Sequence, residues 1–190
     1  MKLRVVVSLL AFLSFVAGAA HAQDTPKVDI FAGYSYVREN PSTAGVNGFS
    51  LNGGSAAIAY NVNNWLSGVA DFGGYNNGNI LGTNVNGTLS TYLFGPRVSY
   101  RHLGRITPFG EVLFGVAHAS GSLSGSTTTV TSSDNAFAMT VGGGVDYNLS
   151  RHFSLRPVKV DYLLTRFSET GTGAQSQNNL RVSTGVVFRF

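Results

Sequence analysis

The sequence predicts an all-β protein, an eight-stranded antiparallel up-and-down barrel that spans a membrane. Eight segments place apolar residues at every second position, and each is near the ~9 to 11 residues that a tilted strand needs to cross a bilayer. The connections between these segments alternate between short and long, so all the short turns fall at one end. Charged residues form 12% of the chain, about half of the ~25% that is usual for soluble domains.

The chain begins with a predicted secretory signal peptide, residues 1–22. It has basic residues near its start, an apolar stretch from Val5 to Val16 and an Ala20-His21-Ala22 cleavage site. The apolar stretch is shorter than the ~20 residues that a transmembrane helix needs. We therefore expect export and a mature chain, residues 23–190, that forms one domain. The sequence contains no cysteine, which excludes disulfide bonds and a lipid-modified cysteine at the cleavage site.

Each predicted strand is defined by its apolar face. The eight strands are expected at 28–38, 48–60, 65–75, 89–101, 107–118, 136–148, 153–167 and 179–190. Their apolar faces run, in the same order, through Ile30–Tyr36, Ala56–Tyr60, Ala70–Phe72, Tyr92–Tyr100, Val112–Val116, Phe137–Tyr147, Val158–Leu164 and Val182–Phe188. No charged residue interrupts these faces in mid-strand, so they are predicted to contact lipid.

The connections predict which end of the barrel faces the cell exterior. Those after the second, fourth and sixth strands span only 61–64, 102–106 and 149–152, whereas the others are long and rich in Gly, Ser, Thr and Asn. In outer-membrane barrels the short turns face the periplasm and the long loops face outward. The polar loop 120–135 is expected to be solvated and to offer a surface for a partner.

The opposite face of the strands combines small residues with a balanced set of charges. Its charged residues are five acids, Asp29, Asp71, Glu111, Asp146 and Asp161, and five bases, Arg97, Arg101, Lys159, Arg181 and Arg189. An eight-stranded barrel is just wide enough inside for side chains, and opposite charges must pair away from water. We expect these ten residues to form ion pairs that plug the lumen; a proton or ion path, and hence a narrow pore, is the alternative.

Aromatic and basic residues near the strand ends are predicted to anchor the barrel at the membrane interfaces. The aromatic anchors are Tyr60, Tyr100 and Tyr147. Arg156 and Arg166 fall on the apolar face, but they bracket the run from Val158 to Leu164, so both are expected to reach the interfaces. A one-residue slip would instead expose several lumen charges to lipid, at about 2 to 4 kcal/mol for each central base, so the register is predicted to be strongly fixed.

Three motifs resemble the small eight-stranded barrels of the OmpA/OmpX-like bacterial outer-membrane family. They are Phe31-Ala32-Gly33-Tyr34-Ser35-Tyr36, Phe94-Gly95-Pro96-Arg97, and the C-terminal end from Gly185 to Phe190. Within the last strand, Ser183, Gly185, Phe188 and Phe190 are similar to the C-terminal insertion signal of outer-membrane proteins. The resemblance covers the barrel domain only, because the chain ends at Phe190 and we expect no peptidoglycan-binding domain.

The resemblance implies a monomeric, porin-like barrel of the Gram-negative envelope, in contact with outer-membrane lipid and lipopolysaccharide. It also implies recognition of the C-terminal strand by the outer-membrane assembly machinery. The roles that it implies are envelope integrity, adhesion or narrow conductance. We expect no cofactor, and the basic residues are scattered singly, which argues against a nucleic-acid partner.

Enzymatic activity is not expected, although one pair of residues offers a candidate site. His118 and Ser120 share one face of a strand, so the imidazole could activate the hydroxyl. The pair resembles the His and Ser of lipid A deacylase barrels, but Gly121 stands where that family has Asn. A metal site at His102 and His152 is also not expected, because further ligands are missing. A soluble ligand-carrying barrel is the alternative fold, and it requires the apolar faces to point inward.

Overall fold

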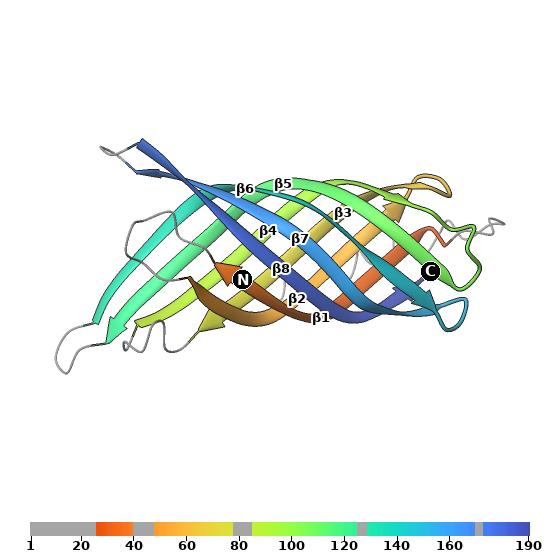
Figure 1. Cartoon of the computed structure of the whole chain (residues 1–190), viewed down its shortest axis with the longest axis horizontal. Coiled ribbons are helices and arrows are strands. Elements are labelled where there is room, and N and C mark those ends of the chain that lie inside the picture. Colours follow the sequence, from red (N-terminus) through yellow and green to blue (C-terminus); the bar gives the residue numbers. More distant parts are fainter. Residues whose placement is uncertain (1–25, 40–47, 78–84, 125–128, 170–172) are drawn as a thin grey trace, which may run out of the picture.

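A computed structural model describes residues 26–39, 48–77, 85–124, 129–169 and 173–190. Its strands form one closed barrel in which each strand pairs with its sequence neighbours and β1 pairs with β8, all antiparallel (Figure 1). The strands are β1 (Val28–Glu39), β2 (Phe49–Asn61), β3 (Leu66–Asn77), β4 (Val85–Ser99), β5 (Ile106–Ser124), β6 (Thr129–Asn148), β7 (Phe153–Glu169) and β8 (Gly173–Arg189). The predicted eight-stranded antiparallel barrel is confirmed.

The predicted signal peptide, residues 1–22, lies outside the described residues. Within the part of the chain that the structure describes, no helix has the length and apolar character needed to cross a membrane.

Hydrogen bonds between the two ends of the chain close the barrel. Val28 N donates to Phe190 O at 3.1 Å, and Phe190 N donates to Val28 O at 2.9 Å. Following the paired residues once around the barrel, from Val28 through β2 to β8, leads back to Arg38, a climb of ten residues. This stagger accompanies the strong tilt of the strands in Figure 1. Together with the number of strands, it sets the width of the interior, which is filled by side chains.

The connections predicted to be short are tight turns at one end of the barrel. In the β2–β3 turn, Asn63 Oδ1 accepts hydrogen bonds from Trp65 N at 3.0 Å and from Leu66 N at 2.7 Å. An Asn side chain that binds its own backbone in this way stabilises a turn. In the β4–β5 turn, Gly104 has a φ of 64°, a left-handed conformation that favours glycine.

The strands reach farther toward the loop end than the sequence predicted. β5 continues to Ser124 and β6 begins at Thr129, with pairing up to Ser124 opposite Thr129, whereas 119–135 was expected to be a loop. This hairpin extends farthest at the lower left of Figure 1. The expectation was wrong because the segment lacks an apolar face, and apolar alternation was the signal used; backbone pairing with β4 and β6 continues through it.

The two faces of the strands differ as predicted. Ile58, Phe94 and Val116 point outward and are 49%, 52% and 50% exposed, whereas Asp71, Asp161 and Arg181 point inward with 0% exposure. A soluble barrel that carries a ligand would show the opposite arrangement. The structure therefore argues against that alternative.

Candidate functional site

Six charged side chains meet in the middle of the barrel, and we call them the central network. Its members are Asp71, Glu111, Asp161, Arg97, Lys159 and Arg181. Arg181 lies 2.7 Å from both Asp71 Oδ1 and Asp161 Oδ2. Lys159 Nζ lies 2.9 Å from Asp71 Oδ2 and also contacts Glu111. Three acids and three bases thus balance one another away from solvent.

The strand register explains how the central network assembles. Arg97 faces Glu111 directly across β4 and β5, and Asp161 faces Arg181 across β7 and β8. Asp71 comes from β3 and reaches Arg181 across the lumen. The network therefore cross-links strands that are not neighbours. Removal of one partner would leave a buried charge unpaired, which typically costs about 3 to 5 kcal/mol.

A second group, the mouth cluster, occupies the short-turn end of the lumen. It comprises Asp29, Asp146, Arg101, Arg156 and Arg189. Arg156 Nε lies 2.7 Å from Asp146 Oδ1, and Arg101 Nη2 lies 3.2 Å from Asp29 Oδ2. Arg189 Nη2 lies 3.4 Å from Asp146 Oδ2. With three bases and two acids, the mouth cluster carries one excess positive charge.

The prediction that Arg156 anchors the outer surface is wrong. Its side chain is fully buried in the lumen, with its guanidinium 4.6 Å from the Phe31 ring centroid and 4.4 Å from that of Phe109. The cause is a β-bulge in β7, where Pro157 and Val158 both point outward and the pairing with β6 and β8 shifts. Strict alternation fails there, and proline is a residue that marks such bulges.

All ten residues predicted to line the lumen do point inward, with Arg101 the least buried of them. One inward acid was missed, Glu39 at the loop end of β1. The alternation of β1 was a sufficient signal for it, since Asp29, Phe31 and Val37 have the same parity. Glu39 lies beyond the outward pair of Arg38 and Ser50, above the apolar belt.

Uncharged side chains fill the loop half of the lumen, and we call them the outer plug. It consists of Val37, Leu51, Tyr75, Leu89, Ala117, Ala136 and Leu163, all buried. Tyr75 joins it to the central network, because Arg181 Nη1 donates to the Tyr75 hydroxyl at 3.1 Å. Burial beside the plug raises the pKa of Glu39 to about 7, against a hydrogen bond with Asn179 that lowers it.

The outer surface carries the other predicted anchors. Tyr60, Tyr100 and Tyr147 are exposed near the short turns. Arg166 is exposed toward the loop end of β7. At the same end, Arg38 Nη1 donates to Ser50 Oγ at 3.1 Å. The apolar outer surface thus lies between an aromatic rim at the short-turn end and a polar rim at the loop end. This is the arrangement expected of residues at the two membrane interfaces.

The four residues predicted as an insertion signal are divided between the two faces of β8. Ser183 points inward and shares a 2.7 Å hydrogen bond with Ser35. Phe188 and Phe190 point outward and are exposed. Gly185 packs so closely against β1 that a Cβ would collide with its backbone. These residues therefore contribute to the packing of β8, the strand that closes the barrel against β1. Their recognition by the assembly machinery stays a prediction.

The candidate catalytic pair does not form a recognisable dyad. His118 Nδ1 lies 2.8 Å from Asn135 Oδ1 on β6. Among the described side chains, no hydrogen bond links His118 to Ser120. The imidazole is therefore held by an amide on the neighbouring strand, without the hydroxyl contact that nucleophile activation needs.

The turn histidines lie at the short-turn end. His102 is exposed, and its ring is 5.2 Å from that of Tyr100. His152 lies in the β6–β7 turn. Within residues 26–39, 48–77, 85–124, 129–169 and 173–190, no group of three or more His, Asp or Glu side chains could hold a metal ion.

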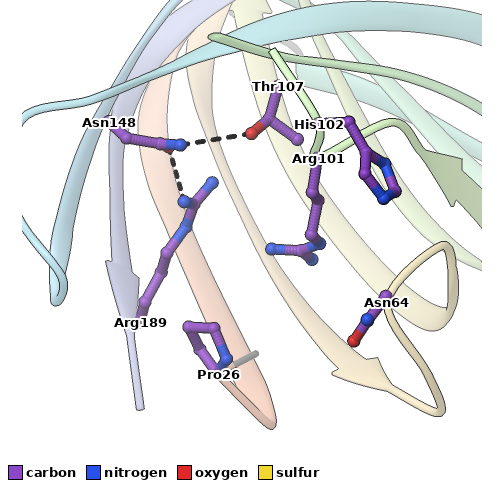
Figure 2. A pocket seen from close by; sticks show the side chains of 7 residues that line it. All are labelled: Pro26, Asn64, Arg101, His102, Thr107, Asn148 and Arg189. Carbon is purple, nitrogen blue, oxygen red and sulfur yellow. Dashed lines mark hydrogen bonds between the residues drawn. The ribbon is translucent and has the colours of Figure 1, made fainter. Parts of the chain in front are cut away.

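A pocket of about 280 Å³ opens at the short-turn end of the lumen. Figure 2 shows its lining residues, which are Pro26, Asn64, Arg101, His102, Thr107, Asn148 and Arg189. Asn148 accepts a hydrogen bond from Arg189 and donates one to Thr107 Oγ1 at 3.2 Å. The lining includes two arginines and no acid.

Comparison with known proteins agrees with this geometry. Residues 8–190 match the outer membrane protein beta-barrel domain family. No curated protein sequence matches the chain.

Several solved barrels share the fold. Neisserial surface protein A has a TM-score of 0.59 at 12% identity, over 86% of this chain and 97% of its own. Ail, the attachment invasion locus protein of Yersinia pestis, has a TM-score of 0.56 at 15% identity, over 86% of this chain and 99% of its own. OprG from Pseudomonas aeruginosa has a TM-score of 0.55 at 12% identity, over 87% of this chain and 97% of its own. At these identities the likeness establishes the fold alone.

Proposed function

Because the chain belongs to the outer membrane protein β-barrel domain family, we propose that it is a non-enzymatic barrel of the bacterial outer membrane that holds a surface-interaction hairpin at the cell exterior. The observation that carries the proposal is the extension of β5 and β6 beyond a filled lumen. Export by cleavage of residues 1–22, recognition of the C-terminal strand during assembly and a monomeric state belong to the same proposal.

The filled lumen supports a structural barrel over a pore. Arg156, Arg181 and Lys159 are among the largest fully buried side chains and lie across the short-turn half and the middle. Leu163 and Val37 close the loop half with 0% exposure. An ion on this route would lose its water beside aliphatic side chains, which is costly.

Among the described residues, the β5–β6 hairpin extends well beyond the polar rim, and β4 pairs alongside β5 up to Val85 opposite Leu123. His118 and Asn135 lie opposite each other at the polar rim, and pairing continues to Ser124 and Thr129. The six further residues of β5 add about 20 Å along the strand, at ~3.3 Å per residue. A paired hairpin presents a defined surface to a partner at lower entropic cost than an unpaired loop.

The composition of the loop end narrows the chemistry of the partner. The segments 40–48, 78–84, 119–135 and 170–172 contain a single charged residue, Asp134, with Glu39 and Glu169 directly before two of them, and many Ser, Thr, Asn and Gly residues. Hydroxyl and amide groups both donate and accept hydrogen bonds. The hairpin is therefore suited to a neutral polar partner, such as an uncharged glycan, more than to a polyanion.

Outer-leaflet lipid is the second proposed partner. Arg38 and Arg166 are exposed at the polar rim, where the phosphate groups of lipopolysaccharide would lie. Guanidinium groups bind phosphate through parallel hydrogen bonds. Ail shows that a barrel of this fold can be an attachment protein, as its name states, but the proposal for this chain rests on its own hairpin.

The test is to shorten the hairpin to the level of the polar rim, which also removes the β5 partners of β4 residues 85–89. Residues 119–134 are replaced by Asn-Gly between His118 and Asn135, which already lie opposite each other. A matched control replaces 167–175 between Arg166 and Ser176 in the β7–β8 hairpin. Cells that display each variant are applied to immobilised neutral glycans and matrix proteins, and their resistance to detergent is measured.

The first variant is expected to keep its heat-modifiable mobility on gels and its detergent resistance, while its surface binding falls at least tenfold. The control variant is expected to keep all three properties. Unchanged binding of the first variant would overturn the surface role. A loss of detergent resistance in the first variant alone would assign the hairpin to envelope integrity. Discrete conductance of the purified barrel in planar bilayers would overturn the closed lumen.

A further inference from the structure

We propose that the pocket at the short-turn end is a binding site for a small oxyanion, a carboxylate or a phosphate, that enters from the periplasm. The proposal goes beyond the surface role, and it rests on the orientation of the barrel with short turns in the periplasm. Its evidence is the charge and geometry of the pocket lining.

Two guanidinium groups approach the pocket from opposite sides of the barrel. Arg101 follows β4, and Arg189 is the last residue of β8. Figure 2 shows both side chains reaching into the same space, with Asn148 and Thr107 beside them. A single oxyanion between them would gain charge-assisted hydrogen bonds from two strands on either side of the lumen.

The lining is a donor-rich surface with excess positive charge. Asp29 and Asp146 lie beside the pocket in the mouth cluster, but neither lines it. They balance only two of the three bases in that cluster. A bound monoanion would therefore neutralise the remaining charge.

Both arginines retain hydrogen-bonding capacity. Among the described residues, Arg101 Nε and Arg189 Nε are buried and have no hydrogen-bond partner. The contact from Arg189 Nε to Asp29 Oδ1 is 3.8 Å long, beyond hydrogen-bonding distance. Arg189 is only 5% exposed, so bulk water satisfies its free N–H poorly. A buried donor without a partner costs free energy, and an oxyanion that draws either guanidinium toward the pocket would give its Nε–H a partner.

The central network and the mouth cluster differ in how their charges are balanced. In the central network, three acids meet three bases, and Arg181 donates to Asp71, Asp161 and Tyr75. That network is charge-balanced without a ligand. The mouth cluster differs from it in charge balance and in its opening to solvent.

The experiment uses the folded mature barrel in detergent micelles, with 15N-labelled arginine. Sodium phosphate and sodium acetate are titrated separately at constant ionic strength, and the Nε–H signals of Arg101 and Arg189 are followed by NMR. Arg101→Gln is the test variant, since it leaves two bases and two acids in the mouth cluster. Arg105→Gln is the matched control, because Arg105 is exposed in the same turn and does not line the pocket.

We expect saturable shifts of both Nε–H signals in the wild-type barrel, at least tenfold weaker binding in R101Q and unchanged binding in R105Q. Saturation by only one of the two anions would identify the class of ligand. Shifts that stay linear to 50 mM for both anions would overturn the site, as would equal affinity in R101Q and wild type. The wild-type titration decides the question by itself if R101Q does not fold. None of these outcomes bears on surface binding by the β5–β6 hairpin.

Discussion

The two halves of the barrel interior differ in chemistry. From the short-turn end to the middle, the lumen holds the central network and the mouth cluster, eleven charged residues in all. Toward the loop end it holds the outer plug, and Glu39 is the charged residue there among those whose burial is described. The first half depends on the pairing of charges, whereas the second depends on close packing.

The difference assigns separate tasks to the two halves. Ion pairs such as that of Asp71 with Arg181 connect strands across the lumen and select one register. The outer plug is aliphatic apart from the Tyr75 ring, and the buried polar side chains beside it, Thr91, Thr165 and Asn179, are few and uncharged. The plug therefore limits conduction even when ion pairs in the central network rearrange, and the network limits strand slippage.

The largest expected effect comes from breaking the central network at Asp71. Asp71→Asn leaves Arg181 and Lys159 short of one buried negative charge. We expect the free energy of unfolding to fall by about 3 to 5 kcal/mol, as measured by urea unfolding in lipid vesicles. Arg105→Gln, an exposed turn substitution, is the control and should change it by less than about 0.5 kcal/mol. A loss for D71N as small as that of the control would mean that water screens the network.

The next largest effect is expected in the loop half of the lumen, where Glu39 makes the stability of the barrel depend on pH. The folded barrel keeps Glu39 protonated up to about pH 7, whereas the unfolded chain ionises it near its ordinary pKa of 4.5. The stability that depends on this group is therefore present below about pH 4.5 and lost as the pH rises to about 7. The loss amounts to about 3 kcal/mol at 1.36 kcal/mol per pKa unit.

Glu39→Gln should remove this pH dependence. Unfolding by urea is measured at pH 5 and pH 8 for the variant and the wild type. The free energy of unfolding of the variant should exceed that of the wild type at pH 8. Equal pH dependence of the two proteins would show that the carboxyl reaches water in the folded state.

A smaller effect is expected at Arg156, where the prediction from sequence failed. Its guanidinium donates two hydrogen bonds to Asp146, at 2.7 and 3.0 Å, and stacks between two phenyl rings. Lysine cannot reproduce this paired geometry. Arg156→Lys should cost about 2 kcal/mol, the scale of a hydrogen bond to a charged group, while Arg166→Lys on the outer surface should be neutral. Equal effects at the two positions would contradict the bulge in β7.

Arg156 also shows how far the sequence determines the fold. Alternation at period two predicted the barrel, the lumen charges and the outward aromatics, because lipid and lumen enforce opposite chemistry on successive residues. The alternation failed in β7, where a bulge at Pro157 inserts one extra residue. The residues before the bulge, including Arg156, therefore point to the opposite face from the one predicted.

The candidate site was only partly predictable for a related reason. The mouth pocket depends on Arg101, just after β4, and Arg189, at the end of β8, which meet only after closure of the barrel. The β5–β6 extension depends on backbone pairing in a segment without an apolar face. Neither feature leaves a periodic signal in the sequence.

The smallest effect is expected where the two halves of the lumen meet. The Tyr75 hydroxyl accepts a hydrogen bond from Arg181 Nη1 and is part of the outer plug. Tyr75→Phe keeps the ring, and therefore the packing, but removes the acceptor. The expected loss in the free energy of unfolding is about 1 kcal/mol, because Arg181 keeps both carboxylates.

A double-mutant cycle with Asp71→Asn measures how strongly the two halves are coupled. If the plug and the network act together, the loss caused by Y75F will be larger in the D71N background than in wild type, since Arg181 then depends more on its remaining partners. Additive losses would mean that packing and charge pairing stabilise the two halves independently, and that Tyr75 only fills space between them.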